Sequence, residues 1–132
     1  MPLPADTDVS TPKYLRDKYA IAGVGETTYT RGSGKTTRAL GTWAVRNAIL
    51  DAGLTAADID GMLSYQSGDS TFAPFIAGDL GIRLNFYMDV FGGGSSTEAL
   101  IGIAMEAVAV SAAVRGFARV FSSYQRRPAI DL

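Results

Sequence analysis

The chain has 132 residues, of which 47% are hydrophobic and 19% charged, and its 12 Lys and Arg residues nearly balance its 13 Asp and Glu residues. This length predicts one domain, and the small net charge argues against recruitment of nucleic acid or of an anionic membrane. The sequence holds neither cysteine nor histidine. Disulfide scaffolds, zinc fingers, cysteine nucleophiles and Ser-His-Asp triads are therefore excluded within this chain.

The first 18 residues predict a flexible lead-in, because they hold prolines at positions 2, 4 and 12 and show no hydrophobic period. They also lack the apolar core of an export signal. The longest apolar run, residues 99–114, is interrupted by Glu106 and is shorter than the roughly 20 residues of a membrane span. The sequence therefore predicts a cytoplasmic protein with no membrane span.

The folded part is predicted to begin with a strand and a helix. Residues 19–25 (Tyr-Ala-Ile-Ala-Gly-Val-Gly) are typical of a buried strand that ends in a glycine turn. A helix is expected to begin at Thr36 or Thr37, either of which can cap it, and to end at about Asp51. Gly53 suits the left-handed position that follows a helix.

Four further elements are expected before the glycine-rich part of the chain. Residues 55–58 (Thr-Ala-Ala-Asp) indicate a capping box over one short turn. Residues 61–66 predict a second strand, residues 71–80 a short helix, and residues 84–91 a third, aromatic strand.

A long third helix is expected from the capping residues 95–97 to about Arg115, followed by a fourth strand over residues 117–124. This helix is apolar on nearly every face, which predicts burial on all sides. The order βαβαβαβ, with spacings long enough for crossovers, predicts an α/β fold with a mostly parallel sheet and a buried central helix. We assign the folded domain to residues 19–125 and a polar tail to residues 126–132.

Two glycine-containing segments have a nucleotide-binding interpretation. Gly23 and Gly25 follow the first strand, but Thr28 occupies the third small position of a dinucleotide fingerprint, so a strand-ending turn is favoured. Residues 32–37 (Gly-Ser-Gly-Lys-Thr-Thr) end like a phosphate-binding P-loop but lack its first glycine. Lys35, at a helix N-terminus, keeps a small nucleotide-binding α/β protein open as an alternative.

The junction at residues 92–98 (Gly-Gly-Gly-Ser-Ser-Thr-Glu) is the strongest candidate site. Gly92, Gly93 and Gly94 allow a backbone or a ligand to approach closely. They lead into the N-terminus of the central helix, whose free N–H groups and positive dipole end favour an oxyanion. A plain helix cap with glycines for packing is an equally good interpretation, and Glu98 in the first turn stabilises the helix in either case.

Three segments resemble the thiolase superfamily. Residues 20–29, followed by a Ser-Gly-Lys-Thr loop, resemble the first strand of thiolase-like lipid-transfer proteins. Residues 48–61 are similar to a helix-and-turn signature of the superfamily, and residues 89–99 resemble the nucleophile loop of its sterol-carrier branch. The resemblance covers about residues 18–125. It implies the N-terminal half of a thiolase-like fold, in which two similar halves pack face to face in proteins that are usually dimeric and act on acyl-CoA thioesters.

The resemblance also implies a site. The nucleophilic cysteine of the family would lie at the glycine-to-helix junction, where this chain has Ser95, Ser96 and Thr97, and Ser96 is the best match. A serine without a neighbouring base is a poor nucleophile at neutral pH. The chain therefore resembles a branch that lacks the cysteine and includes aldolases acting on steroid side-chain acyl-CoAs. In that branch residues 92–94 would shape the acyl pocket and offer N–H donors to the thioester oxygen.

The partners follow from the same resemblance. It implies a CoA thioester as substrate, with no bound cofactor and no metal, and either a homodimer mate or a complementing thiolase-like half. An OB-fold and zinc-ribbon accessory protein accompanies the aldolase branch. The predicted function is an acyl-CoA-handling protein, acetyltransferase-like or an aldolase-type carbon–carbon lyase subunit, that is inactive as an isolated half. A non-catalytic acyl-CoA- or lipid-binding or assembly subunit is the alternative.

Overall fold

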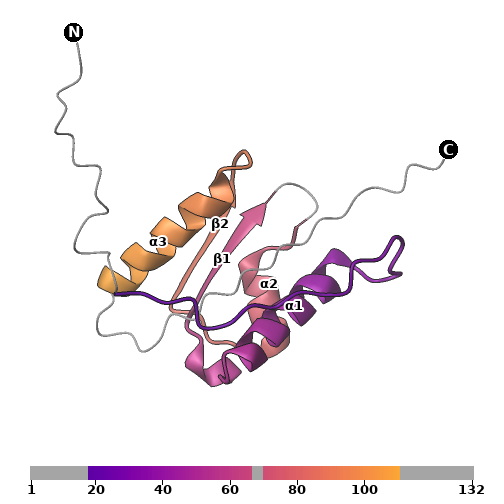
Figure 1. Cartoon of the computed structure of the whole chain (residues 1–132), viewed down its shortest axis with the longest axis horizontal. Helices are drawn as coiled ribbons and strands as arrows, with labels where there is room; N and C mark the ends of the chain where they lie inside the picture. The colour runs from indigo at the N-terminus through magenta and orange to yellow at the C-terminus, as the bar shows by residue number, and fades with distance from the viewer. Residues whose placement is uncertain (1–17, 67–69, 111–132) are drawn as a thin grey trace, which may run out of the picture.

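The computed structural model describes residues 18–66 and 70–110. In chain order its elements are α1 (Thr37–Asp51), the short 3-10 helix η1 (Ala56–Asp58), β1 (Gly61–Gln66), α2 (Ala73–Leu80), β2 (Phe86–Phe91) and α3 (Ser96–Val110). Figure 1 shows α3 on one face of the β1–β2 sheet and α2, with α1 beside it, on the other.

The two strands pair in parallel, as the sequence predicted. Gly61 lies opposite Phe86, and the register continues without interruption to Gln66 opposite Phe91. A parallel pair needs a crossover connection, and α2 supplies it. The predicted fourth strand, residues 117–124, lies outside the described residues.

Local signals explain where α1 begins and ends. The Thr36 hydroxyl oxygen accepts a hydrogen bond from the Ala39 N–H at 3.1 Å, which confirms the predicted cap. After the helix, Gly53 adopts a φ of 68°, a left-handed conformation in which glycine is favoured because it has no Cβ. The N–H groups of Gly53 and Leu54 each donate at 3.0 Å to carbonyl oxygens in the last turn of the helix. This pair of bonds is the Schellman motif.

The hydrophobic core lies between α1, α2 and the start of β1. Its members come from two helices, the loops beside them and β1, and each large side chain stabilises the fold by about 1.5–3 kcal/mol through burial. They are Val45, Ile49, Ile59, Met62, Ala73, Ile76, Ala77 and Ile82.

The strand predicted over residues 19–25 is not formed. This segment lies on α1 instead, so closely that a Cβ on Gly25 would overlap the Ala44 carbonyl oxygen and the Ala48 nitrogen. A Cβ on Gly23 would likewise overlap the Ala48 carbonyl oxygen. The glycines that the sequence suggested as a strand-ending turn therefore serve a close approach to the helix.

Polar groups of α1 replace the ladder bonds that a strand would make. The Val24 N–H donates to Asp51 Oδ2 at 2.9 Å, and Asn47 Nδ2 donates to the Glu26 carbonyl oxygen at 2.9 Å. Because backbone groups need partners wherever they find them, these two bonds hold the segment along the helix rather than in the sheet.

Helix α3 packs on the sheet along one stripe. Ser96, Leu100 and Ala104 are buried, at four-residue spacing, whereas the other residues of α3 up to Val108 are partly or largely exposed. The predicted burial on all sides is therefore found on one side only within the described residues, because β1 and β2 cover no more than one face of a helix. No helix in the described part of the chain is long and apolar enough to cross a bilayer.

Candidate functional site

The glycine-to-helix junction is a tight turn between β2 and α3. The Ser96 N–H donates to the Gly93 carbonyl oxygen at 3.0 Å, and the Ala99 N–H donates to the Ser95 carbonyl oxygen at 3.2 Å. Ser95 is therefore the cap residue and Ser96 the first residue of the helix. Among the described residues, Ser96 is the buried polar side chain, with 9% of its surface exposed. The sequence did not distinguish between Ser95, Ser96 and Thr97, whereas the structure shows that Ser96 is the buried one.

The side chain of Ser96 folds back over Gly92. A Cβ on Gly92 would overlap Ser96 Oγ, whereas a Cβ on Gly93 or Gly94 would meet nothing within 4 Å. Among the three glycines, a side chain at position 92 would therefore displace the Ser96 hydroxyl from its place over the turn. The other two glycines face open space, where a ligand has room to approach the backbone.

Tyr65 of β1 is a member of this junction that the sequence did not indicate. Its Oη donates to the Gly92 carbonyl oxygen at 2.8 Å. Tyr65 lies opposite Val90 in the parallel register, so its position beside the turn depends on strand pairing across 25 residues. No local motif could have revealed this contact.

The start of α2 is attached to the same end of the sheet. Asp89 Oδ1 accepts a hydrogen bond from the buried Ala73 N–H at 2.9 Å, and Ser64 Oγ donates to the Thr71 carbonyl oxygen at 3.1 Å. A carboxylate at a helix N-terminus satisfies a free N–H group and interacts favourably with the helix dipole. These bonds fix the carboxyl ends of both strands, from which the junction emerges.

At this junction the start of α3 presents backbone N–H groups, and the sequence supplies no histidine to act as a base for the Ser96 hydroxyl. The first N–H groups of α3 lack partners within the helix, as at any helix start. Histidine, the usual base for a serine nucleophile, is absent from the sequence. Within the described ranges, no cluster of three acidic, histidine or cysteine side chains could hold a metal ion.

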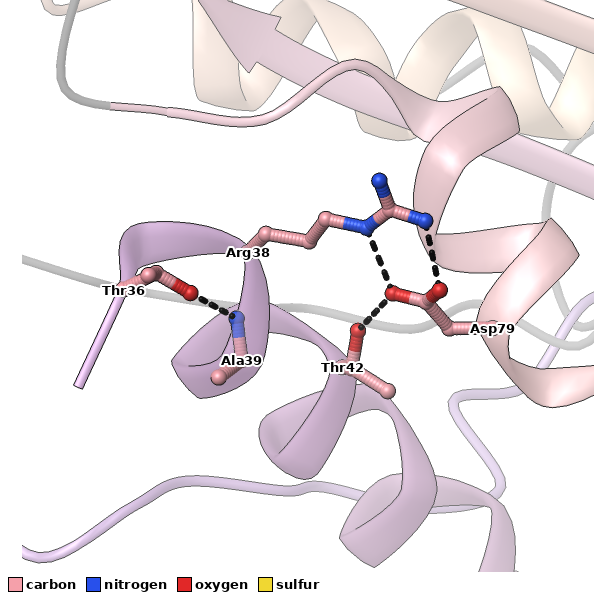
Figure 2. Close-up of polar contacts among 5 residues, drawn as sticks. All are labelled: Thr36, Arg38, Ala39, Thr42 and Asp79. Carbon is pink, nitrogen blue, oxygen red and sulfur yellow. Dashed lines mark hydrogen bonds and ion pairs between the residues drawn. The ribbon is translucent and has the colours of Figure 1, made fainter.

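A second polar cluster joins the outer helices α1 and α2 (Figure 2). Arg38 donates to Asp79 through Nε at 2.7 Å and through Nη2 at 2.6 Å. Thr42 Oγ1 donates to the same carboxylate at 3.2 Å. The hydrogen bond from Arg38, followed by that from Thr42, lowers the pKa of Asp79. The cluster links two helices at the surface and leaves the carboxylate charged at neutral pH.

Lys35 lies beside this cluster, in a shallow hollow that also includes Trp43 and Asp79. Its Nζ is 4.9 Å from the centroid of the Trp43 ring, a cation–π contact. The hollow therefore presents a carboxylate and an engaged ammonium group, which do not match the ring of backbone N–H donors that cradles phosphates in a P-loop. The hollow lies on the α1–α2 side of the sheet, whereas the glycine junction lies at the start of α3 on the other side (Figure 1).

Comparison with models of known protein families gives no match. The chain is 34% identical over 108 residues to a steroid side-chain-cleaving aldolase of Thermomonospora curvata, an alignment that covers 80% of this chain and 26% of the relative. It is 33% identical over 100 residues to a 17-hydroxy-3-oxo-4-pregnene-20-carboxyl-CoA lyase of Mycobacterium tuberculosis, covering 75% of this chain and 26% of that relative. The chain thus spans about a quarter of the length of these curated relatives.

Comparison with solved structures identifies the type of fold. The Ltp2-ChsH2(DUF35) aldolase matches with a TM-score of 0.64 and 36% identity, over 69% of this chain and 24% of that one. A fungal type III polyketide synthase, ORAS, matches with a TM-score of 0.50 and 27% identity, over 58% of this chain and 21% of that one. The α/β fold is therefore thiolase-like, as the sequence predicted.

Proposed function

We propose that this chain is the N-terminal part of an aldolase-type, thiolase-like protein that handles acyl-CoA thioesters and cleaves a carbon–carbon bond without a nucleophilic cysteine. The names of both curated relatives and of the Ltp2-ChsH2(DUF35) aldolase support an aldolase or lyase acting on a steroid side chain or a CoA ester. The observation that carries the proposal is the Ser96 side chain, buried against Gly92 at the start of α3.

The name of the mycobacterial relative suggests the substrate class. It places a hydroxyl group on carbon 17 of a steroid and a CoA-esterified carboxyl group on the neighbouring side-chain carbon, number 20. In a retro-aldol step a base removes the hydroxyl proton, and the bond between the hydroxyl-bearing carbon and the α-carbon breaks. Its electron pair forms the thioester enolate, and the hydroxyl carbon becomes a ketone. An acid then protonates the α-carbon.

No step of this reaction forms a bond to the protein, so a serine can occupy the position at which thiolases have cysteine. What the reaction needs at this position is stabilisation of the negative charge that develops on the thioester oxygen. Backbone N–H groups at the start of a helix, reached past Gly93 and Gly94, meet that need. In the proposal Ser96 fills space and holds the turn, and residues 92–94 shape the acyl pocket.

The acid and base are proposed to come from outside this chain's described part. A homodimer mate or a complementing thiolase-like half would cover the open side of α3, and an OB-fold and zinc-ribbon protein would be the accessory partner. The name of the Ltp2-ChsH2(DUF35) aldolase joins two components, which supports a two-component assembly. The isolated chain is accordingly expected to be inactive.

Two assays test the proposal. The isolated chain, incubated with acetoacetyl-CoA and CoA, should show no turnover, and thiolysis by the chain alone would contradict it. In the assembly that contains the chain, Ser96→Ala should reduce the rate of cleavage of a β-hydroxyacyl-CoA by less than about tenfold, because removal of a true nucleophile costs a thousandfold or more. Tight binding of the CoA ester without turnover in that assembly would favour a non-catalytic subunit.

A further inference from the structure

The first peptide of the glycine turn is held from two elements. Tyr65 Oη, from β1, donates to the Gly92 carbonyl oxygen at 2.8 Å, and Ser96 Oγ, from α3, covers the Gly92 Cα. Tyr65 is the second-last residue of its strand and Gly92 the first residue after β2. Both strands thus end beside the glycine turn, and β1 fixes the orientation of its first peptide through Tyr65.

Fixing the carbonyl fixes the N–H group as well. In a planar trans peptide the C=O and N–H bonds point in opposite directions, and the described backbone has no cis peptide. The N–H of Gly93 therefore points away from Tyr65. A hydrogen bond accepted by the carbonyl also polarises the peptide and strengthens its N–H as a donor. The space on the Cβ side of Gly93 is open, since a Cβ there would meet nothing within 4 Å.

We propose that Tyr65 is a positioning residue, which orients the Gly92–Gly93 peptide so that the Gly93 N–H faces the residue-96 side of the turn as a donor to a negatively charged ligand atom. The inference deepens the proposed function, on which it rests, by adding a residue of β1 to the machinery that would stabilise a thioester enolate. Tyr65 acts through the peptide and contacts no reacting atom.

If Tyr65 only supported the shape of the turn, its loss would not change how well the turn stabilises a negative charge. A single thiol at the turn can distinguish this role from the proposed one. Because the chain has no cysteine, Ser96→Cys introduces one unambiguous probe at the turn. The thiolate is the reactive form, so the pH profile of alkylation by iodoacetamide has a midpoint that reports how well the turn stabilises a negative charge. A change in the accessibility of the thiol alters the alkylation rate by the same factor at every pH, whereas a change in the stabilisation of the thiolate moves the midpoint of the profile.

In the Ser96→Cys background, Tyr65→Phe should move the midpoint to higher pH by at least about 0.5 pH unit, because the freed peptide no longer presents its N–H end. Tyr87→Phe is the matched control. Tyr87 lies on β2 and is 55% exposed, and its substitution should leave the midpoint unchanged. An unchanged midpoint in a folded Tyr65→Phe variant, judged by circular dichroism, would overturn the proposal.

A second pair of variants keeps the proposal testable if Tyr65→Phe fails to fold. Gly93→Pro removes the N–H donor and leaves Tyr65 in place, and Gly93→Ala keeps the donor in a position with space for a methyl group. The proline variant should raise the midpoint by at least about 0.5 pH unit and the alanine variant should not. Equal midpoints in the two variants would contradict the assigned donor.

Binding of propionyl-CoA, measured by calorimetry on the full chain, separates the inference from the proposed function. With both correct, the chain binds propionyl-CoA and Tyr65→Phe weakens binding at least about fivefold, as for one hydrogen bond to the neutral thioester oxygen. Absence of binding by the unmodified chain would count against the proposed function, while the thiol midpoint would still decide the role of Tyr65. Binding that is equal in both proteins would overturn the inference alone.

Discussion

Replacing Gly25 with alanine is expected to destabilise the protein strongly. The new Cβ would overlap the Ala44 carbonyl oxygen and the Ala48 nitrogen and would lie 2.9 Å from the Ala48 Cα. All three are backbone atoms of α1, so no side-chain rotation can relieve the overlap. Either the helix must shift or the segment of residues 19–25 must leave it.

The expected loss is about 3 kcal/mol in the free energy of unfolding. Overpacking of this kind costs about 1–3 kcal/mol. Lifting the segment from the helix would also break its hydrogen bonds with Asp51 and Asn47, and each such bond contributes about 0.5–1.5 kcal/mol. A loss of this size is a large share of the roughly 5–15 kcal/mol that stabilises an ordinary domain.

Urea unfolding followed by far-ultraviolet circular dichroism measures this difference. Gly78→Ala is the matched control, because Gly78 lies within α2 and a Cβ there would meet nothing within 4 Å. That substitution should stabilise the protein by about 0.5–1 kcal/mol through helix propensity. If Gly25→Ala stays within about 0.5 kcal/mol of the parent, the packing of residues 19–25 on α1 is wrong and the strand predicted from the sequence regains its place.

Three further variants test the junction and the outer cluster. Ser95→Cys should react with a disulfide reagent about tenfold faster than Ser96→Cys, because residue 95 is exposed and residue 96 is buried; equal rates would contradict the burial of the Ser96 side chain. Asp79→Asn should lower the melting temperature near pH 7, and the difference should shrink in acid. The hydrogen bond with Arg38 is the first cause of the lowered pKa of Asp79; the stabilisation that it gives is full above the unfolded-state pKa and is lost as the pH falls through the folded-state pKa, so a difference that does not shrink as the pH is lowered would refute this origin. Asp89→Ala should cost about 1–3 kcal/mol in urea unfolding, because it leaves a buried N–H at the start of α2 without its acceptor, and Asp89→Asn, which keeps an oxygen acceptor, should cost less.

The elements that the sequence predicted well are those marked by local chemistry. Thr36 caps α1, Gly53 follows it in a left-handed conformation, and Gly81 ends α2 with a φ of 69°. Pro74 lies in the first turn of α2, as expected. Each of these signals acts within a few residues, so one sequence suffices to find it.

The error at residues 19–25 has the opposite origin. A short run of small and β-branched residues becomes a strand only where another strand completes its hydrogen bonds. Here Asp51 and Asn47 complete them from a helix. Gly23 and Gly25 fit both a turn and a close helix contact, and the sequence alone does not distinguish these.

Only the part of the candidate site that is local in sequence could be identified from the sequence. The glycines and Ser96 lie within five consecutive residues, so a local motif reveals them, and the structure shows which of the three hydroxyl residues is buried. Tyr65 lies 27 positions before Gly92 in the sequence. Only the register of β1 against β2 brings them together, and register is a property of the pair of strands.

The parallel pairing of β1 and β2 also has a consequence for how the chain folds. Paired residues such as Gly61 and Phe86 lie 25 positions apart (61 to 86), and closing a loop of that length costs about 3 kcal/mol of chain entropy before any ladder bond forms. Helix α2 shortens the span, and Asp89 ties its first turn to β2. We therefore expect residues 61–91 to collapse as one cooperative nucleus, with a rate that falls when Asp89 is replaced, and α1 and its overlying segment to dock afterwards.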